Sequence, residues 1–356
     1  SYLENVNADD LTLTDNNLSV QQINELMSIN NRLTMFWSAN IPLQSFIEIL
    51  KFETEYLPEI SFDRIILDWN SINKNRKLTV FLLNTTNRTL YRTTIEHQVE
   101  SRVLNTFVEP TKSFYIYTEI KRGNFLSLYT PANSVESVKY MYLMNKDIPI
   151  DKFKKILFQN QEIIQQSETD SVKQYNDSMS IMTVDTKNRI LNYVYPRSVG
   201  LAHIEPSRLL RESFNFINEH GGYNVDYRLS LINIDKHIVE YQMYYQGLPV
   251  FSAETATKIS TTWGDEEIHK YRRPYYVLEN DIPTEMKVKY LPSGLEIVEK
   301  YVHSDEDIKD LVLGYYLIQN LELNVFELEP AWFTLKENSW ERVKLENIGG
   351  IPNGLE

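Results

Sequence analysis

Two stretches of this chain share the pattern of one β-hairpin. Ser180–Asp185 (Ser-Ile-Met-Thr-Val-Asp) matches Ser230–Asp235 (Ser-Leu-Ile-Asn-Ile-Asp), and after a short polar turn Ile190–Tyr193 matches Ile238–Tyr241. Alternating apolar and polar residues indicate half-buried strands. A helix-like segment precedes each copy, about twenty residues before the first and about ten before the second. The pattern predicts a duplicated β-rich scaffold that binds or senses a partner, although the unequal spacing departs from a strict repeat.

The length of 356 residues favours two or three domains over one core. Hydrophobic residues make up 42% of the chain and aromatic residues 12%, which is typical of a globular protein that contains β-structure. Helical and strand patterns alternate along the chain. The fold class is therefore predicted as α+β, with three domains built on mainly antiparallel sheets flanked by helices.

Charge and cysteine content exclude several functions. The formal net charge is −13, and the acidic residues concentrate in residues 1–60 and 296–356. Sequence-independent binding to nucleic acid or to anionic lipid is therefore not expected. The absence of cysteine excludes disulfides, thiolate zinc sites and a cysteine nucleophile. No apolar stretch approaches the roughly 20 residues that a membrane-spanning helix needs. Because the chain begins at Ser1 without Met, a removed anchor or signal segment remains open.

Local patterns place the secondary structure. Strands are expected wherever apolar residues alternate, and Lys121-Arg-Gly-Asn124 predicts a hairpin turn. Ser207 is expected to cap one helix, which Gly221 and Gly222 would end. The predicted helices are Val20–Ile29, residues 42–52, Glu96–Val108, Ile150–Phe158, Ser207–His220 and Pro292–Val302.

Breaks in these patterns suggest domain boundaries. Residues 1–19 are polar and rich in Asn and Asp, and are expected to form a flexible stalk on the membrane side. A first α+β domain is predicted over residues 20–134, a middle one over 135–205 and a C-terminal one over 206–345. Residues 346–356 are expected to be a tail.

Motifs for catalysis or metal binding are weak. None of the six His residues forms a spaced metal pair. Asp305-Glu-Asp307 opens like a calcium loop but lacks the glycine and glutamate that follow in that loop. Ser71-Ile-Asn-Lys74 fits a nucleophile motif without its companion segments. Glu266 and Glu267 would face opposite sides of a strand, although a carboxylate pair from distant positions is not excluded. We predict no catalytic, cofactor-binding or metal-ligating residues.

Aromatic and basic residues are interleaved in one segment. Aromatic rings and Arg supply much of the binding energy at protein interfaces, so this segment is the predicted partner-binding site. Packing within the core or on a sheet face is the competing and more frequent role of such residues. The predicted residues are Trp263, Tyr271, Arg272, Arg273 and Tyr275.

The order of several segments resembles the YycH (WalH) family. These are the hairpin strands of Asp68–Leu83, Tyr140–Phe158 with its Ile-Pro and Lys-Phe-Lys-Lys-Ile-Leu-Phe passages, Tyr175–Ser178 (Tyr-Asn-Asp-Ser), Leu191–Pro196 (Leu-Asn-Tyr-Val-Tyr-Pro) and Leu328–Trp332 (Leu-Glu-Pro-Ala-Trp). The resemblance covers the chain from about residue 20 to residue 345. No single motif is diagnostic, and the resemblance depends on their order and spacing.

The resemblance implies a single-pass membrane protein of Gram-positive bacteria, anchored by an N-terminal transmembrane helix that this chain lacks. The chain would be the extracellular body. It implies a non-enzymatic role without cofactors, in which the protein modulates the sensor histidine kinase WalK (YycG) together with YycI by protein–protein contact. It also implies that the last two domains are related to each other and to the extracellular part of YycI.

The alternative function is a secreted or anchored module that binds cell-wall glycan or peptide, or a hydrolase acting there. In that case the segment Trp263–Tyr276 would hold the ligand. A hydrophobic span immediately upstream of Ser1 in the full gene would favour the kinase regulator, whereas a cleavable signal would favour the secreted module.

Overall fold

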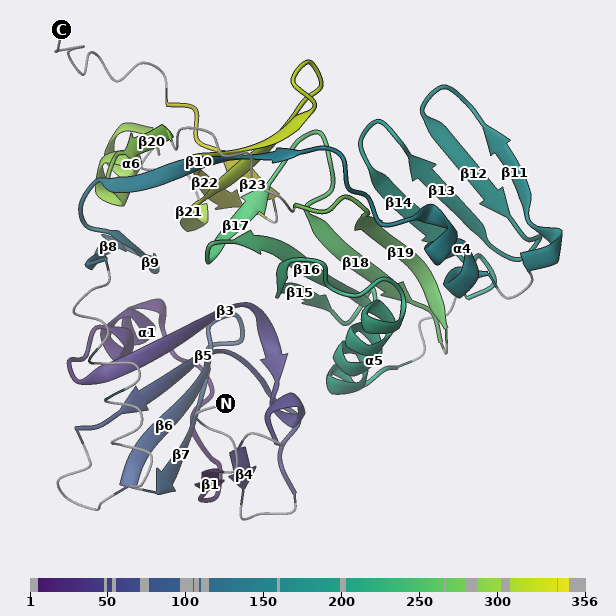
Figure 1. Cartoon of the computed structure of the whole chain (residues 1–356). Helices are drawn as coiled ribbons and strands as arrows, with labels where there is room; N and C mark the ends of the chain where they lie inside the picture. Colours follow the sequence, from purple (N-terminus) through teal and green to yellow (C-terminus); the bar gives the residue numbers. More distant parts are fainter. Residues whose placement is uncertain are drawn as a thin grey trace, which may run out of the picture.

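The structure, a computed structural model, describes residues 6–47, 50–52, 56–70, 77–96, 105, 109, 115–158, 161–198, 203–265, 267–278, 287–301, 308–337 and 339–345. These residues form a seven-stranded sheet, a 14-stranded sheet and a separate two-stranded hairpin (Figure 1). Helices flank the sheets, and nearly all strand pairs are antiparallel. The predicted α+β class is confirmed.

The seven-stranded sheet is formed by the N-terminal part of the chain. Its order is β3-β5-β6-β7-β1-β4, and β2 pairs with β7. α1 (Val20–Met27) lies beside it and begins at a capping box in which Ser19 accepts a hydrogen bond from the Gln22 N–H. The strands are β1 (Val6–Ala8), β2 (Thr12–Asp15), β3 (Arg32–Pro42), β4 (Leu50–Phe52), β5 (Ser61–Asp68), β6 (Lys77–Asn84) and β7 (Thr89–Glu96).

Two predictions for this region are wrong. The predicted stalk forms strands β1 and β2 over residues 6–15, and Ala8 is fully buried. The predicted helix over residues 42–52 is a short 3-10 turn, η1 (Leu43–Phe46), followed by β4. The physical cause is strand pairing, because β1 and β4 pair with each other in parallel and β2 pairs with β7. Such long-range pairing overrides a local side-chain pattern.

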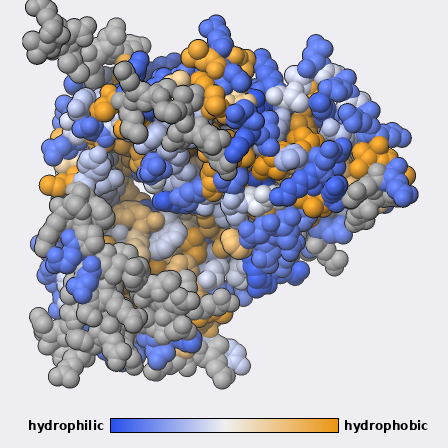
Figure 2. All heavy atoms as spheres, in the orientation of Figure 1, coloured by the Kyte–Doolittle hydropathy of each residue, from blue (hydrophilic) through white to orange (hydrophobic). Residues whose placement is uncertain are grey.

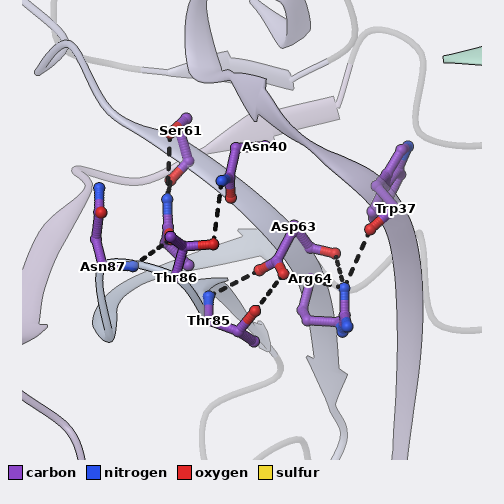
Figure 3. A network of polar contacts seen from close by, with 9 residues as sticks. Trp37, Asn40, Ser61, Asp63, Arg64, Thr85, Thr86 and Asn87 are labelled. Carbon is purple, nitrogen blue, oxygen red and sulfur yellow. Dashed lines mark hydrogen bonds and ion pairs between the residues drawn. The ribbon is translucent and has the colours of Figure 1, made fainter. Parts of the chain in front are cut away.

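A polar network fixes the β6–β7 loop to neighbouring strands (Figure 3). The buried Asp63 carboxylate on β5 accepts hydrogen bonds from the backbone N–H of Thr85 at 2.9 Å and from the Thr85 hydroxyl. It also pairs with Arg64, whose guanidinium donates to the Trp37 carbonyl of β3 at 3.2 Å. Asn84 donates to the Ser61 carbonyl at 2.9 Å. These hydrogen bonds hold the loop against β5 at this end of the sheet.

The 14-stranded sheet extends from β10 to β23. Its main path is β11-β12-β13-β14-β19-β18-β16-β17-β21-β22-β10-β20, with β15 beside β16 and β23 beside β22. The strands are β10 (Val135–Leu143), β11 (Gln165–Glu168), β12 (Val172–Asn176), β13 (Ile181–Asp185), β14 (Ile190–Val194), β15 (Asp226–Asn233), β16 (Ile238–Tyr245), β17 (Leu248–Phe251), β18 (Lys258–Trp263), β19 (Ile268–Pro274), β20 (Lys287–Leu291), β21 (Ile308–Asn320), β22 (Val325–Lys336) and β23 (Ser339–Arg342).

One half of this sheet consists of two units with similar topology, apart from β17, which lies between β16 and β18 in the chain and pairs with β16 and β21. α4 (Ile150–Leu157) precedes the meander β11-β12-β13-β14, and α5 (Pro206–Glu219) precedes β15-β16-β18-β19. The last strands of the two meanders, β14 and β19, pair antiparallel. Each meander therefore runs from an outer strand, β11 or β15, to this central pair. Both helices cover the same face, where they share one hydrophobic core with the strands (Figure 1).

This arrangement changes the meaning of the matched hairpins. β13–β14 is the last hairpin of its unit, whereas β15–β16 is the first hairpin of the other unit. The unequal helix-to-hairpin spacing follows, because β11 and β12 lie between α4 and β13. The alignment of the first strands is also wrong by two residues, since Asp185 and Asn233 hold the same place before their loops.

A shared turn explains the hairpin similarity. Four hairpins, β6–β7, β13–β14, β15–β16 and β21–β22, have a four-residue loop whose last residue has φ between 50° and 57°. In each, the Asn or Asp before the loop accepts a hydrogen bond from the backbone N–H three residues later, at 2.7–3.1 Å. This local chemistry is known to favour turns. The residues before the loops are Asn84, Asp185, Asn233 and Asn320.

The two sheets are joined in two places. The hairpin of β8 (Tyr117–Arg122) and β9 (Phe125–Pro131) contacts α1 on one side and β21 and α6 (Gly294–Tyr301) on the other. Leu229 of β15 packs against the core of the seven-stranded sheet. Figure 2 shows mainly hydrophilic side chains on this face, with apolar groups in the recess between the sheets.

The predicted domain boundaries relate to these sheets in different ways. The predicted boundary between residues 134 and 135 separates β9 from β10. The predicted boundary between residues 205 and 206 separates strands that belong to one continuous sheet. The division into domains remains a prediction. One local expectation is corrected, because Glu205, not Ser207, is the N-cap of α5. The expected helix over 96–108, Ser71–Lys74, Asp305–Asp307 and Glu266 lie mainly or wholly outside the described residues.

Candidate functional site

A pocket of about 300 Å³ lies between α4 and α5, over the paired strands β14 and β19. It is therefore at the junction of the two helix-and-meander units. Its walls combine aromatic rings, two carboxylates and the Ser180 and tyrosine hydroxyls. The lining residues are Ile156, Leu157, Asp177, Met179, Ser180, Tyr193, Tyr195, Phe216, His220, Trp263, Glu267 and Ile268.

Asp177 is the buried charged group of this pocket. Only 3% of its surface is exposed. Its Oδ1 accepts hydrogen bonds from the N–H groups of Met179 and Ser180 at 3.1 and 2.8 Å, and from the Ser180 hydroxyl at 2.9 Å. Within the described part of the chain, no donor bonds to Oδ2. Asp177 thus closes the turn before β13 with one oxygen and retains acceptor capacity on the other.

The aromatic side of the pocket is held rigidly by α5. The Trp263 indole N–H donates to the Ser213 hydroxyl at 2.8 Å. Phe216 meets Trp263 edge to face, with ring centroids 5.9 Å apart, and stacks on His220 at 3.8 Å. These contacts fix the ring orientations without a bound ligand.

His220 ends α5, and its burial favours the neutral imidazole. Burial lowers the pKa of His220 below 6.5, against the opposing effects of the Phe216 carbonyl, Glu219 and the Ile156 carbonyl. Its Nδ1 lies 2.7 Å from the Phe216 carbonyl oxygen. A neutral ring leaves the pocket without a positive charge on its lining near pH 7.

The lowered pKa of His220 predicts a pH dependence of stability. Below pH 6.5 the unfolded chain binds a proton at this residue that the folded chain resists, so stability falls as pH decreases through this range. Between about pH 7.5 and 5.5, the free energy of unfolding of His220→Asn should fall less steeply than that of the wild type. Urea unfolding at several pH values measures this, with the exposed His203→Asn as control. Equal slopes for wild type and His220→Asn would contradict the assignment.

Arg273 lies beside this pocket, beneath the end of α5. It is fully buried, and its guanidinium donates to the Pro274 and His220 carbonyls at 3.0 and 3.3 Å and to the Tyr271 hydroxyl at 3.0 Å. It also lies 5.4 Å from the Phe153 ring centroid of α4. Among the described residues, no carboxylate pairs with it. Gly221, at φ 114°, allows its close approach, because a Cβ there would lie 2.4 Å from Nη1.

A second hollow, of about 430 Å³, lies between β20 and β23. Lys289 and Lys344 on its wall are exposed. Arg342 pairs with Glu329 at 3.2 Å and lies over the Tyr316 ring. No buried charged group of the described chain lines this hollow, in contrast to the pocket between α4 and α5.

Two family models match this chain, one in its N-terminal part and one in its C-terminal part. A model of the YycH protein N-terminal domain matches residues 6–113, and a model of the YycH protein C-terminal domain matches residues 126–349. The chain belongs to the YycH family. The resemblance predicted from the order of its segments is confirmed.

Individual YycH proteins support this assignment. The two-component system WalR/WalK regulatory protein YycH of Bacillus subtilis (strain 168) is 21% identical over 313 residues, which are 85% of this chain and 68% of the relative. The crystal structure of YycH from Bacillus subtilis matches with a TM-score of 0.75 at 17% identity, covering 96% of this chain and 87% of that one. At this identity the structural match shows the shared fold.

The structure separates the five residues predicted to bind a partner. Trp263 is half-buried and lines the pocket, while Tyr271, Arg273 and Tyr275 are buried. Arg272 is exposed on the opposite face of β19, where it donates to Asn192 Oδ1 at 2.9 Å. Their role in partner binding remains a prediction, and only Trp263 and Arg272 offer accessible surface for it.

Sequence reasoning missed Asp177 and His220 as pocket residues. Asn176-Asp-Ser178 before a strand signals a turn, but nothing local predicts that this turn meets α5. No cluster of three or more His, Asp or Glu side chains suited to a metal ion occurs in the described ranges. In those same ranges, no helix has the length and apolarity needed to cross a bilayer.

Proposed function

We propose that this YycH-family chain is a non-enzymatic regulator that changes the activity of the WalK sensor kinase by protein–protein contact, together with YycI. The observation that supports this is the match of family models along almost the whole chain, with a relative named as a regulatory protein of the WalR/WalK system. The proposal includes action outside the cell, with the chain attached to the membrane by a segment upstream of Ser1.

The fold is consistent with a contact-based role. The pocket between α4 and α5 is small compared with many substrate clefts. A regulator of this kind must bind one kinase state more tightly than the other, because equal affinities shift no equilibrium. A tenfold shift in the ratio of kinase states needs about 1.4 kcal/mol of difference in binding free energy.

Co-purification of the membrane-anchored full-length protein with WalK and with a YycI-like protein tests the proposal. We expect both partners to be retained, and kinase autophosphorylation in reconstituted membranes to change when the regulator is added. Arg272→Glu should reduce retention while leaving folding intact, because this side chain is exposed. The matched control is Lys236→Glu in an exposed hairpin loop. Failure to retain either partner would reject the regulatory proposal.

If wild type and Arg272→Glu retain the partners equally well, the predicted role of Arg272 is wrong, although the regulatory proposal stands. The two results are therefore distinguishable in one experiment.

A further inference from the structure

We propose that the pocket between α4 and α5 binds the cationic end of an Arg or Lys side chain presented by a partner protein. This rests on the proposed function, since it assigns a site and a chemistry to the contact with a regulatory partner. The inference follows from the buried carboxylate, the aromatic wall, the charge of the rim and the size of the pocket.

The buried carboxylate comes first. Only 3% of the surface of Asp177 is exposed, and this residue lines the pocket. All its hydrogen bonds are made by Oδ1, and within the described chain no donor bonds to its Oδ2. This oxygen is therefore left to accept a hydrogen bond from water or from a ligand that enters the pocket. A guanidinium or ammonium group supplies a charge-assisted hydrogen bond, which is stronger than a neutral one.

The aromatic wall favours a cation on an apolar stem. Trp263, Phe216 and Tyr193 line the same pocket as Asp177. Aromatic faces attract cations, and Trp does so most strongly. Ile156 and Leu157 of α4 add an apolar surface along which the methylene groups of a Lys or Arg side chain can pack.

The charge around the pocket selects a cation over an anion. Glu267 adds a second carboxylate to the lining, with its side chain exposed. The pKa of Tyr193 is raised by burial first and also by the charges of Asp177 and Glu267, so both carboxylates act on the same part of the pocket. Arg197 is exposed, and its Nη1 lies 3.9 Å from Met179 Sδ on the pocket wall.

The size of the pocket indicates one side chain. A volume of about 300 Å³ is at the lower limit for small-molecule sites and suits a single long side chain better than a folded segment or a saccharide chain. Because rigid contacts already fix Trp263 and Phe216, little ordering entropy is lost on binding.

The test uses Trp263 as the reporter. Protein labelled with 5-fluorotryptophan is titrated with Nα-acetyl-arginine amide or with Nα-acetyl-citrulline amide, a neutral analogue of similar shape. The Trp263 resonance is assigned with Trp263→Phe. We expect a saturable shift with the arginine compound, at a concentration about tenfold lower than with the citrulline compound. Nα-acetyl-lysine amide should also shift it.

Asp177→Asn is the decisive variant. Asn keeps an Oδ1 acceptor for the turn at Met179 and Ser180 but removes the negative charge, so the fold should persist and half-saturation should require about tenfold more of the arginine compound. Glu267→Gln should add a smaller effect, since this residue is exposed. The matched control is Asp235→Asn, in an exposed hairpin loop of the same sheet.

Three results would overturn the inference: equal shifts from the arginine and citrulline compounds, no shift from either, or unchanged affinity in a folded Asp177→Asn protein. Circular dichroism and thermal unfolding establish folding of each variant. If Asp177→Asn fails to fold, the comparison of wild-type binding of arginine with citrulline still decides. No kinase is present in this titration, so its failure would leave the regulatory proposal intact.

Discussion

Replacing Arg273 by glutamate is expected to lower the free energy of unfolding by about 4 kcal/mol. Arg273 is fully buried under the end of α5, where its guanidinium donates to two carbonyls and to the Tyr271 hydroxyl. A glutamate would leave these acceptors without their donor and place a carboxylate next to carbonyl oxygens. Both effects penalise the folded state, because buried polar groups need partners.

The position has a built-in control in the next residue along β19. Arg272 is exposed on the other face of the sheet, so Arg272→Glu changes the net charge by the same amount without burial. Its free energy of unfolding should stay within about 0.5 kcal/mol of the wild type. Urea unfolding followed by circular dichroism measures both variants, and similar losses in the two would show that Arg273 is not the buried group described here.

A further variant separates charge from packing. Arg273→Met keeps most of the side-chain volume beside Phe153 while removing a buried cation that has no carboxylate partner in the described chain. Replacing buried ionic groups by apolar ones of similar size is often close to neutral. We therefore expect Arg273→Met to cost clearly less than Arg273→Glu, and a larger loss with Met would contradict this interpretation.

Local pattern predicted much of the fold. The alternation of apolar and polar residues located most strands, including β13 to β16, and Gly221 and Gly222 correctly ended α5 with φ of 114° and 70°. The same period of two implies that Arg272 and Arg273 face opposite sides of β19. The prediction that both bind one partner overlooked this difference. The alternation shows that the two side chains lie on opposite faces, but it does not show which face α5 covers.

The pairing of distant segments was beyond local reasoning. β14 and β19 are neighbours through Tyr193 and Tyr271, which are 78 residues apart in sequence. This pairing brings Asp177, near β13, to the same pocket as Trp263, at the end of β18. In the sequence, the segment around Asp177 shows only a turn signal, and the segment around Trp263 stands out only by its aromatic and basic composition. Their combination depends on register, which no short pattern specifies.

The duplicated hairpin shows how local chemistry can imitate a repeat. The structure does contain two units of similar topology, but the matched hairpins hold different places in them. What the two hairpins share is a turn in which Asp185 or Asn233 accepts a backbone hydrogen bond and Arg189 or His237 adopts a positive φ. The same turn occurs at β6–β7 in the other sheet. Turn chemistry of this kind arises wherever a short hairpin loop is needed.

Truncating Trp332 to alanine should cost about 4 kcal/mol of unfolding free energy. Trp332 is a fully buried residue of β22, packed in one core with Leu128 of the β8–β9 hairpin and Ile297 of α6. Its indole N–H donates to the Pro292 carbonyl at 3.0 Å. Removal would leave a cavity at the point where the hairpin that contacts the N-terminal helix α1 is attached to the large sheet.

Two comparisons give this prediction its specificity. Trp332→Phe retains a ring and should lose about 1 to 2 kcal/mol, from the missing hydrogen bond and a smaller cavity. Trp340→Ala, at a partly exposed residue of β23 that contacts Phe251, should lose less than Trp332→Ala because less surface is buried there. Thermal and urea unfolding measure all three. If Trp332→Ala and Trp340→Ala were equally stable, the attachment of the hairpin would not depend on Trp332, and the core formed by β9, α6 and β22 would contribute less than its burial indicates.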